Sequence, residues 1–141
     1  MGIEFAYQST QGLLVLRVTD VPTADEVAAS RAKGDNLRDF GNMTAMLLDL
    51  REQAGSILTA QTARAILVQC DRHCRQVAPE HKDFPIAILA TPGSIGHGIG
   101  RMFMGHAYGL ERLKLAQFDD LETASDWLNL PPDWQIGLAA S

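Results

Sequence analysis

The sequence contains few basic residues, few cysteines and no long apolar run, and each of these absences excludes a class of protein. Its 12 Lys and Arg against 17 Asp and Glu give a formal net charge of −5 over 141 residues. Because binding to a phosphate backbone needs clustered cations, nucleic acid is not an expected partner. No apolar stretch approaches the roughly 20 residues that cross a bilayer, so no transmembrane segment is expected. The first residues lack a signal-peptide pattern and the 2 cysteines suit a reducing compartment, so we expect a cytoplasmic location.

The composition that is present is typical of one folded domain. Hydrophobic residues make up 46% of the chain and charged residues 21%, which are ordinary values for a globular protein. A chain of this length is long enough to bury one core without disulfides. We therefore expect a single domain over residues 1–130, followed by a C-terminal tail over 131–141 that Trp134 attaches to the domain.

Apolar residues repeat along the chain with strand-like and helix-like spacings. Period-two alternation on either side of Gly12 predicts an N-terminal β-hairpin. Strands and helices then alternate, which is typical of parallel strands in an α/β fold. The expected order is β-β-α-β-α-β-α-β-α, with a mixed β-sheet that is antiparallel at the hairpin and parallel afterwards. The predicted strands span residues 3–8, 13–18, 44–50, 84–90 and 113–118; the predicted helices begin at Thr23, span 59–77, follow residue 93 as far as Gly109, and span 121–128.

Two cysteines and two histidines lie close together in the sequence and are residue types that bind zinc: Cys70, His73, Cys74 and His81. Cys70 and Cys74, however, share the apolar stripe of the predicted helix at 59–77 with Leu67, where a free cysteine acts as a small hydrophobic residue. Their spacing of four also differs from a Cys-x-x-Cys pair. We therefore expect packing roles, with no metal and no cofactor. The polar side of the same helix is predicted to carry Arg64, Asp71, Arg72 and Arg75.

Several glycines follow the predicted strand at 84–90 and open the next helix. Free N–H groups at a helix N-terminus attract anions, and glycines let a ligand approach the backbone. Ser94, Gly96, Gly98 and Arg101 are therefore candidate ligand-binding residues, with Arg101 as the cation for an anionic group. The spacing matches neither a dinucleotide-binding nor a nucleoside-triphosphate motif, and Ser94 lacks the Gly-x-Ser-x-Gly pattern of hydrolases. Close packing of helix on sheet, and a surface salt bridge for Arg101, are the alternative explanations.

The C-terminal third carries a family resemblance, in the segments PIAILA at 85–90, GRMF at 100–103, AQFDDLETA at 116–124 and WL at 127–128. With these segments the chain resembles the SpoIIAA-like branch of the STAS fold, a group also likened to Sec14-type lipid-binding domains. The resemblance implies a sheet with helices mainly on one face and no established enzymatic activity. The lipid-binding analogy implies a small apolar pocket but transfers no specific residue.

The resemblance also implies a candidate phosphorylation site. In STAS anti-anti-sigma proteins, a serine that begins the helix after the central strand is phosphorylated and controls partner binding. Ser56 lies nearest to that position here, and a phosphate at a helix N-terminus is electrostatically favoured. The family's Asp-Ser pattern is missing, because Asp49 is followed by Leu50, Arg51 and Glu52. A turn or capping role is the alternative for Ser56.

Three hypotheses about function follow. The first is a non-catalytic regulatory or ligand-binding module whose partner is an unknown protein or a small apolar or anionic ligand. The second is a small enzyme that uses the glycine-rich turn at 93–100, in which Arg101 holds an anionic substrate and His97 moves a proton. The third is a phosphoswitch through Ser56. A homodimer is a further expectation, because apolar residues surround a full turn of the glycine-rich helix: Met102, Phe103, Met104 and Tyr108.

Overall fold

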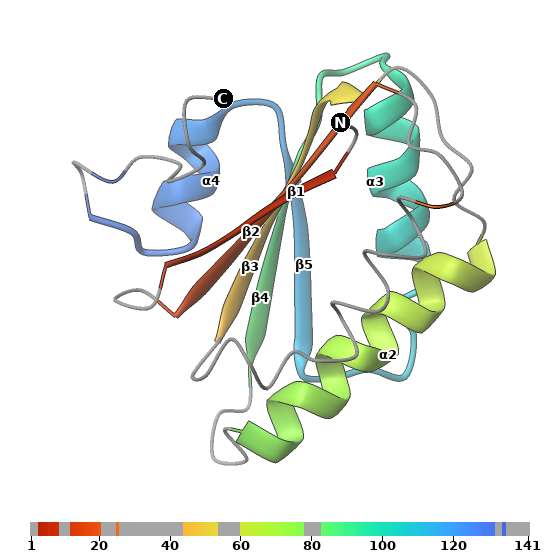
Figure 1. Cartoon of the computed structure of the whole chain (residues 1–141), viewed down its shortest axis with the longest axis vertical. Helices are drawn as coiled ribbons and strands as arrows, with labels where there is room; N and C mark the ends of the chain where they lie inside the picture. The colour runs from red at the N-terminus through yellow and green to blue at the C-terminus, as the bar shows by residue number, and fades with distance from the viewer. Residues whose placement is uncertain are drawn as a thin grey trace.

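A five-stranded mixed sheet forms the centre of the computed structural model, which describes residues 3–8, 12–20, 25, 44–53, 60–77, 83–131 and 134 (Figure 1). The strands lie side by side in sequence order, with β1 antiparallel to β2 and each later strand parallel to its neighbour. The predicted mixed sheet is therefore confirmed. The strands are β1 (Ile3–Gln8), β2 (Leu13–Asp20), β3 (Ala45–Gln53), β4 (Phe84–Leu89) and β5 (Leu113–Phe118).

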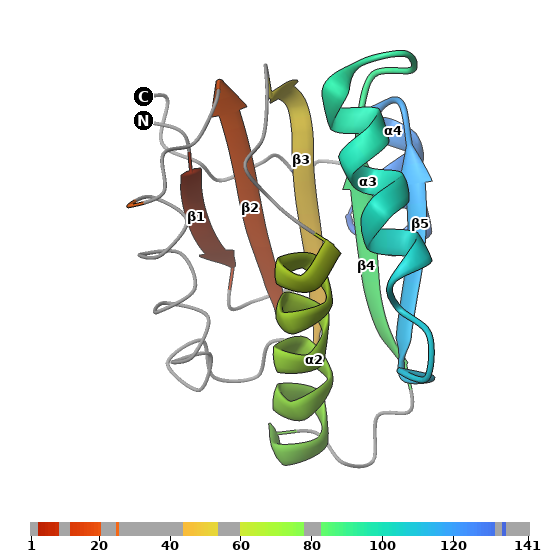
Figure 2. The same ribbon diagram turned by 90° about the vertical axis from the view of Figure 1, so that its right-hand side faces the viewer.

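Helices cover both faces of this sheet. Helices α2 (Ala60–Val77) and α3 (Ile95–Gly105) lie on one face, and the short helix α4 (Leu121–Trp127) lies on the other (Figures 1 and 2). Two of these three helices therefore share a face, as the family resemblance implies. Of the helix predicted to begin at Thr23, only Asp25 is among the described residues, and it is helical. None of the described helices is long and apolar enough to cross a membrane.

Two hydrophobic clusters hold these layers together because alternate residues of each strand point to opposite faces. Side chains between the sheet and helices α2 and α3 form the larger cluster, which includes Leu48, Phe84, Ile88 and Phe103. A smaller cluster lies between the sheet and α4 and includes Leu47, Leu89 and Ala124. Trp134 packs against the smaller cluster, and its indole N–H donates to the side chain of Gln8 in β1. Trp134 thus attaches to the domain, as expected.

Three elements end at least two residues away from the prediction. β2 continues to Asp20 rather than residue 18. β3 continues to Gln53 rather than residue 50, because it keeps pairing with β2 after a register shift next to Arg17. α3 ends at Gly105 rather than Gly109. Gly109 has a φ of +76°, in the left-handed region that glycine adopts most easily, so the chain has already left the helix there.

The apolar stripe of α2 is confirmed, whereas its predicted polar side is partly wrong. Cys70 and Cys74 are buried in the larger cluster with Leu67, as the periodicity predicts. Asp71, by contrast, is only 7% exposed. Its carboxylate accepts a hydrogen bond of 2.9 Å from Nε of Arg75, one helical turn further on, and this ion pair offsets part of the cost of burial.

Candidate functional site

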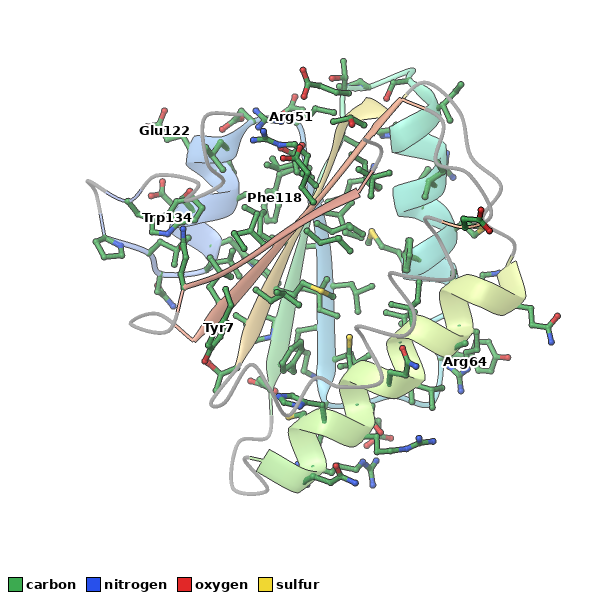
Figure 3. The ribbon with its side chains drawn as sticks, viewed as in Figure 1. Tyr7, Arg51, Arg64, Phe118, Glu122 and Trp134 are labelled. Carbon is green, nitrogen blue, oxygen red and sulfur yellow. The ribbon has the colours of Figure 1, made fainter. Side chains whose placement is uncertain are left out.

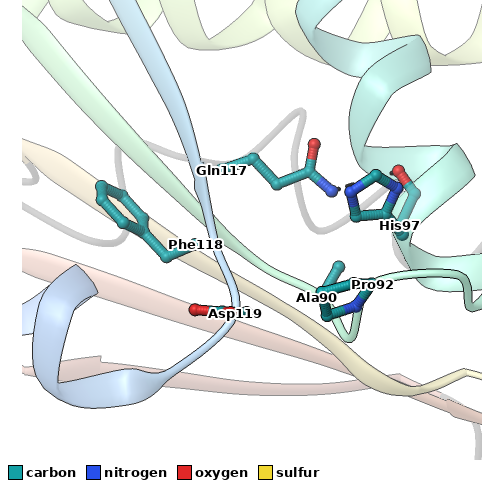
Figure 4. A pocket seen from close by; sticks show the side chains of 6 residues that line it. All are labelled: Ala90, Pro92, His97, Gln117, Phe118 and Asp119. Atoms are coloured by element: carbon teal, nitrogen blue, oxygen red, sulfur yellow. Dashed lines mark hydrogen bonds between the residues drawn. The ribbon is translucent and has the colours of Figure 1, made fainter.

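A pocket of about 360 Å³ lies at the carboxyl ends of β4 and β5 (Figure 4). From this edge the chain leaves β4 toward α3 on one face and leaves β5 toward α4 on the other, so the two connections diverge. Clefts of this volume and position in α/β proteins are typical ligand sites. The lining residues are Ala90, Pro92, His97, Gln117, Phe118 and Asp119, and we call this site the carboxyl-edge pocket.

Three polar side chains from two elements line the carboxyl-edge pocket. His97 comes from the first turn of α3, and Gln117 and Asp119 come from the end of β5 and the residue after it. Nε2 of Gln117 donates a hydrogen bond of 3.1 Å to the backbone oxygen of His97, which joins β5 to α3 across the pocket (Figure 4). An imidazole, an amide and a carboxylate suit a small polar ligand. Of these three, the sequence had indicated only His97.

Ser94 begins α3 as its N-cap residue. Its Oγ accepts a hydrogen bond of 3.1 Å from the backbone N–H of His97 and donates one of 2.6 Å to the carbonyl of Thr91. The hydroxyl therefore accepts a hydrogen bond from a helix N–H group that has no partner within the helix, and it donates its own hydrogen bond within the turn. Ser94 does not line the carboxyl-edge pocket, so it is not placed as a nucleophile toward it.

The glycines of α3 divide into two groups according to which side of the helix they occupy. A Cβ on Gly96 would lie 2.2 Å from the backbone oxygen of Leu50, and one on Gly100 would lie 2.9 Å from side-chain atoms of both Gln117 and Ile88. These two positions are glycine because the helix packs closely on the sheet. A Cβ on Gly98 would meet no atom within 4 Å in the part of the chain that the structure describes.

Arg101 lies on the same exposed side of α3 as Gly98. It makes no ion pair with a described residue and does not line the carboxyl-edge pocket. The structure thus places His97 at the pocket, whereas Arg101, one helical turn further along α3, is not among the residues that line it. A ligand contact through Ser94, Gly96, Gly98 and Arg101 stays a prediction, and Ser56 lies outside the described residues.

The apolar residues that suggested a homodimer are not equivalent. Phe103 is buried in the larger cluster and Met102 is half-buried against it. Met104 and Tyr108 are 41% and 67% exposed. The guanidinium of Arg64 lies 4.1 Å from the centre of the Tyr108 ring and donates to the Tyr108 backbone carbonyl, so Arg64 ties α2 to the loop after α3.

A buried ion cluster, which the sequence did not reveal, lies on the α4 face of the sheet, because Asp49 shares a side of β3 with Leu47 of the smaller cluster. Figure 3 labels one of its residues, Arg51. Asp49 of β3 is 3% exposed and accepts hydrogen bonds of 3.0 and 2.9 Å from the side chain of Arg51, with a third of 3.1 Å from its backbone N–H. Nε of Arg17 in β2 lies 3.4 Å from the same carboxylate. Burial alone would raise the pKa of Asp49, but the hydrogen bonds from Arg51 and the charges of both arginines lower it below its ordinary value.

Three of the four residues that suggested a zinc site lie in the core. Cys70 and Cys74 are buried and neither forms a disulfide with a described residue, and His73 is also buried. Within the part of the chain that the structure describes, no three Cys, His, Asp or Glu residues form a group that could hold a metal ion. His81 lies outside the described residues. Cys70 and Cys74 are part of the larger hydrophobic cluster, and the absence of a metal stays a prediction.

Cys70 is expected to resist thiol reagents in the folded protein. Burial, assisted by the nearby Asp71 and Cys74, raises its pKa to about 12, and the thiolate is the reactive form. With an aromatic disulfide reagent at mildly alkaline pH, labelling of the native protein should be at least about a hundredfold slower than in urea, because reaction then requires opening of the fold. Equal labelling rates in the native and unfolded protein would contradict this burial.

Comparison with known proteins identifies the class of fold. Neither a protein-family model nor a curated protein matches the sequence. Solved structures do match, and they show that the chain has a SpoIIAA-like fold, the fold of STAS domains. One is the anti-sigma factor antagonist SpoIIAA in its unphosphorylated form, with 12% identity and a TM-score of 0.59 over 92% of this chain and 99% of that one. Another is a DUF3478-family protein of SpoIIAA-like fold from Shewanella loihica PV-4, with 18% identity and a TM-score of 0.53 over 90% of this chain and 93% of that one.

Proposed function

We propose that this chain is a non-catalytic regulatory module of STAS type that acts by binding another protein through the outer side of α3. The observation that carries this proposal is the open space over Gly98 and Gly105, where an added Cβ would meet no atom of a described residue within 4 Å. Ile95, Gly98, Met102 and Gly105 follow one another at steps of three, four and three residues, so these four residues lie on one side of the helix. We call these four residues the glycine strip.

The cost of glycine in a helix supports a binding role for the glycine strip. A glycine in a helix interior costs about 1 kcal/mol relative to alanine. Gly96 and Gly100 have a reason within this chain, because the sheet fills the space where a Cβ would stand. Gly98 has no such reason, and the backbone of a second protein approaching α3 would supply one. Ile95, which is 50% exposed, provides an apolar contact in the same strip.

The fold supports the same conclusion about the class of partner. SpoIIAA, whose fold this chain shares, is an antagonist of an anti-sigma factor and therefore acts on another protein. We therefore favour a protein partner over a small ligand. We propose that this chain binds that partner in the cytoplasm. The alternative hypothesis, a phosphoswitch through Ser56, is tested separately by phosphopeptide mapping of the protein from its native cells.

The enzyme alternative receives less support from the geometry. It requires Arg101 to hold an anionic substrate while His97 moves a proton, yet His97 lines the carboxyl-edge pocket and Arg101 does not. A small polar ligand bound at His97, Gln117 and Asp119 remains the second candidate function. It would make the module responsive to a ligand without requiring a reaction.

Gly98→Trp is expected to reduce capture of the protein partner from a lysate of the native cells at least about tenfold, because a bulky side chain keeps the partner's backbone away from α3. The measurement is affinity capture with quantitative mass spectrometry. Gly98→Ala should give a smaller loss in the same direction, because one added Cβ already stands where the partner's backbone approaches α3. Glu122→Trp, on the opposite face of the sheet, is the control for exposed tryptophan and should retain the proteins that the native chain enriches. A set of enriched proteins that is unaffected by Gly98→Trp, or no enriched protein at all, contradicts the proposal.

A further inference from the structure

β5 forms one edge of the sheet, and one row of its backbone groups points away from β4. The carbonyl of Phe118 accepts a hydrogen bond of 3.0 Å from the N–H of Ala90, on the β4 side. Because the backbone groups of successive residues point to opposite sides of a strand, those of Leu115 and Gln117 point outward. Among the described residues no strand pairs with this edge, and Figure 2 shows β5 at the margin of the sheet with α3 and α4 on either side.

Exposed apolar side chains flank this edge on both faces. Met104 follows His97 by seven residues, about two helical turns, so it lies on the side of α3 that faces the carboxyl-edge pocket and β5. It is 41% exposed. On the other face, Trp127 of α4 is 37% exposed and its ring lies 5.5 Å from that of Phe118. An open strand edge between two apolar side chains is a template for the binding of a further strand.

The outward groups of β5 are complementary to those of a second copy of the same strand. In an antiparallel pairing that sets Ala116 opposite Ala116 of the second copy, Leu115 faces Gln117 of the second copy. By symmetry Gln117 faces Leu115 of the second copy. Each such pair exchanges two N–H to carbonyl hydrogen bonds, so all the outward N–H and carbonyl groups of these two residues are satisfied.

The charges around β5 favour the same arrangement. Its amino end carries Arg112 and the exposed Lys114, and the exposed Asp119 and Asp120 follow its carboxyl end. Antiparallel pairing brings Arg112 and Lys114 to Asp120 of the second copy, whereas parallel pairing would place like charges together. We propose that the outer edge of β5 is a homodimer interface, at which the sheets of two copies join into one. It is separate from the glycine strip, so it does not rest on the proposed function.

Amide hydrogen exchange measured by NMR on the whole chain tests this interface without a mutation. In a monomer the N–H groups of Leu115 and Gln117 face water and exchange quickly, whereas those of Lys114 and Ala116 bond to β4. In the dimer all four are protected. Raising the chain concentration from about 5 to about 500 micromolar should therefore slow exchange at Leu115 and Gln117 at least about tenfold, in step with a doubling of mass in sedimentation.

Two variants complete the test, and circular dichroism establishes that each is folded. Leu115→Pro removes an outward donor without removing a bond to β4, so it should be a monomer at every concentration. Lys114→Glu should weaken the dimer by about threefold to tenfold. Arg72→Glu, the same charge change at an exposed position of α2, should leave the dimer unchanged. The proposal is overturned by a monomer whose Leu115 and Gln117 amides always exchange quickly. It is equally overturned by protection that does not depend on concentration, or by a dimer that Leu115→Pro leaves intact.

Discussion

Gly96→Ala is expected to lower the free energy of unfolding by about 3 kcal/mol, because overpacking against a backbone atom cannot be relieved by a side-chain rotation. The new Cβ would stand 2.2 Å from the carbonyl oxygen of Leu50. Leu50 lies in β3, which is paired with both β2 and β4, so the strand cannot move away alone. α3 must therefore lift from the sheet, which reduces the packing of Phe103 and Ile99 in the larger cluster.

Gly98→Ala is the matched control, since it makes the same substitution in the same helix two residues away. None of the described residues has an atom within 4 Å of the added Cβ, so helix propensity is the property that changes. The expected result is a gain of up to about 1 kcal/mol in the free energy of unfolding. Urea unfolding of the two variants, followed by circular dichroism, measures the difference. Equal stabilities would show that α3 does not pack against β3 at Gly96.

The sequence contains the information that separates these two glycines, although the ligand hypothesis treated them alike. Gly96 precedes Ile99 by three residues and Phe103 by seven, so all three share the apolar side of a helix. Gly98 lies off that side. The order of strands and helices along the chain was likewise predictable, because short apolar runs and turn residues are local signals. The end of α3 was not, because the sequence offers a glycine at both 105 and 109 and the structure places the C-cap at His106.

Contacts between distant parts of the chain account for most of the features that could not be predicted from the sequence. Arg17 and Asp49 are 32 residues apart, and they meet only because β2 and β3 pair in a register that sets one opposite the other. The carboxyl-edge pocket also combines two separate connections, after β4 and after β5. The sequence did contain a signal that Gln117 and Asp119 belong to a site, because they lie at the carboxyl end of a predicted parallel strand, where ligands bind in α/β folds.

Asp49→Ala is expected to lower the free energy of unfolding by about 3 kcal/mol, because it removes one partner of a buried ion cluster. Arg51 would lose the carboxylate that its side chain contacts at 3.0 and 2.9 Å, and Arg17 would lose the same partner. Asp126→Ala, the same substitution at an exposed position of α4, should change stability by less than about 0.5 kcal/mol. Chemical unfolding at neutral pH measures both. An Asp49→Ala protein as stable as Asp126→Ala would show that the cluster contributes nothing.

The lowered pKa of Asp49 gives this contribution a predictable pH dependence. Below the ordinary carboxyl pKa the unfolded chain binds a proton at this position before the folded chain does, so stability falls as pH falls. The contribution of Asp49 is therefore complete above about pH 5 and decreases as pH drops from about 4 through the lowered folded value. Asp120, whose pKa is also lowered, acts in the same direction and is present in both proteins. The stability difference between the native chain and Asp49→Asn should thus shrink on acidification. A difference that stays constant or grows between about pH 5 and pH 2 would mean that the charge of Asp49 does not stabilise the fold.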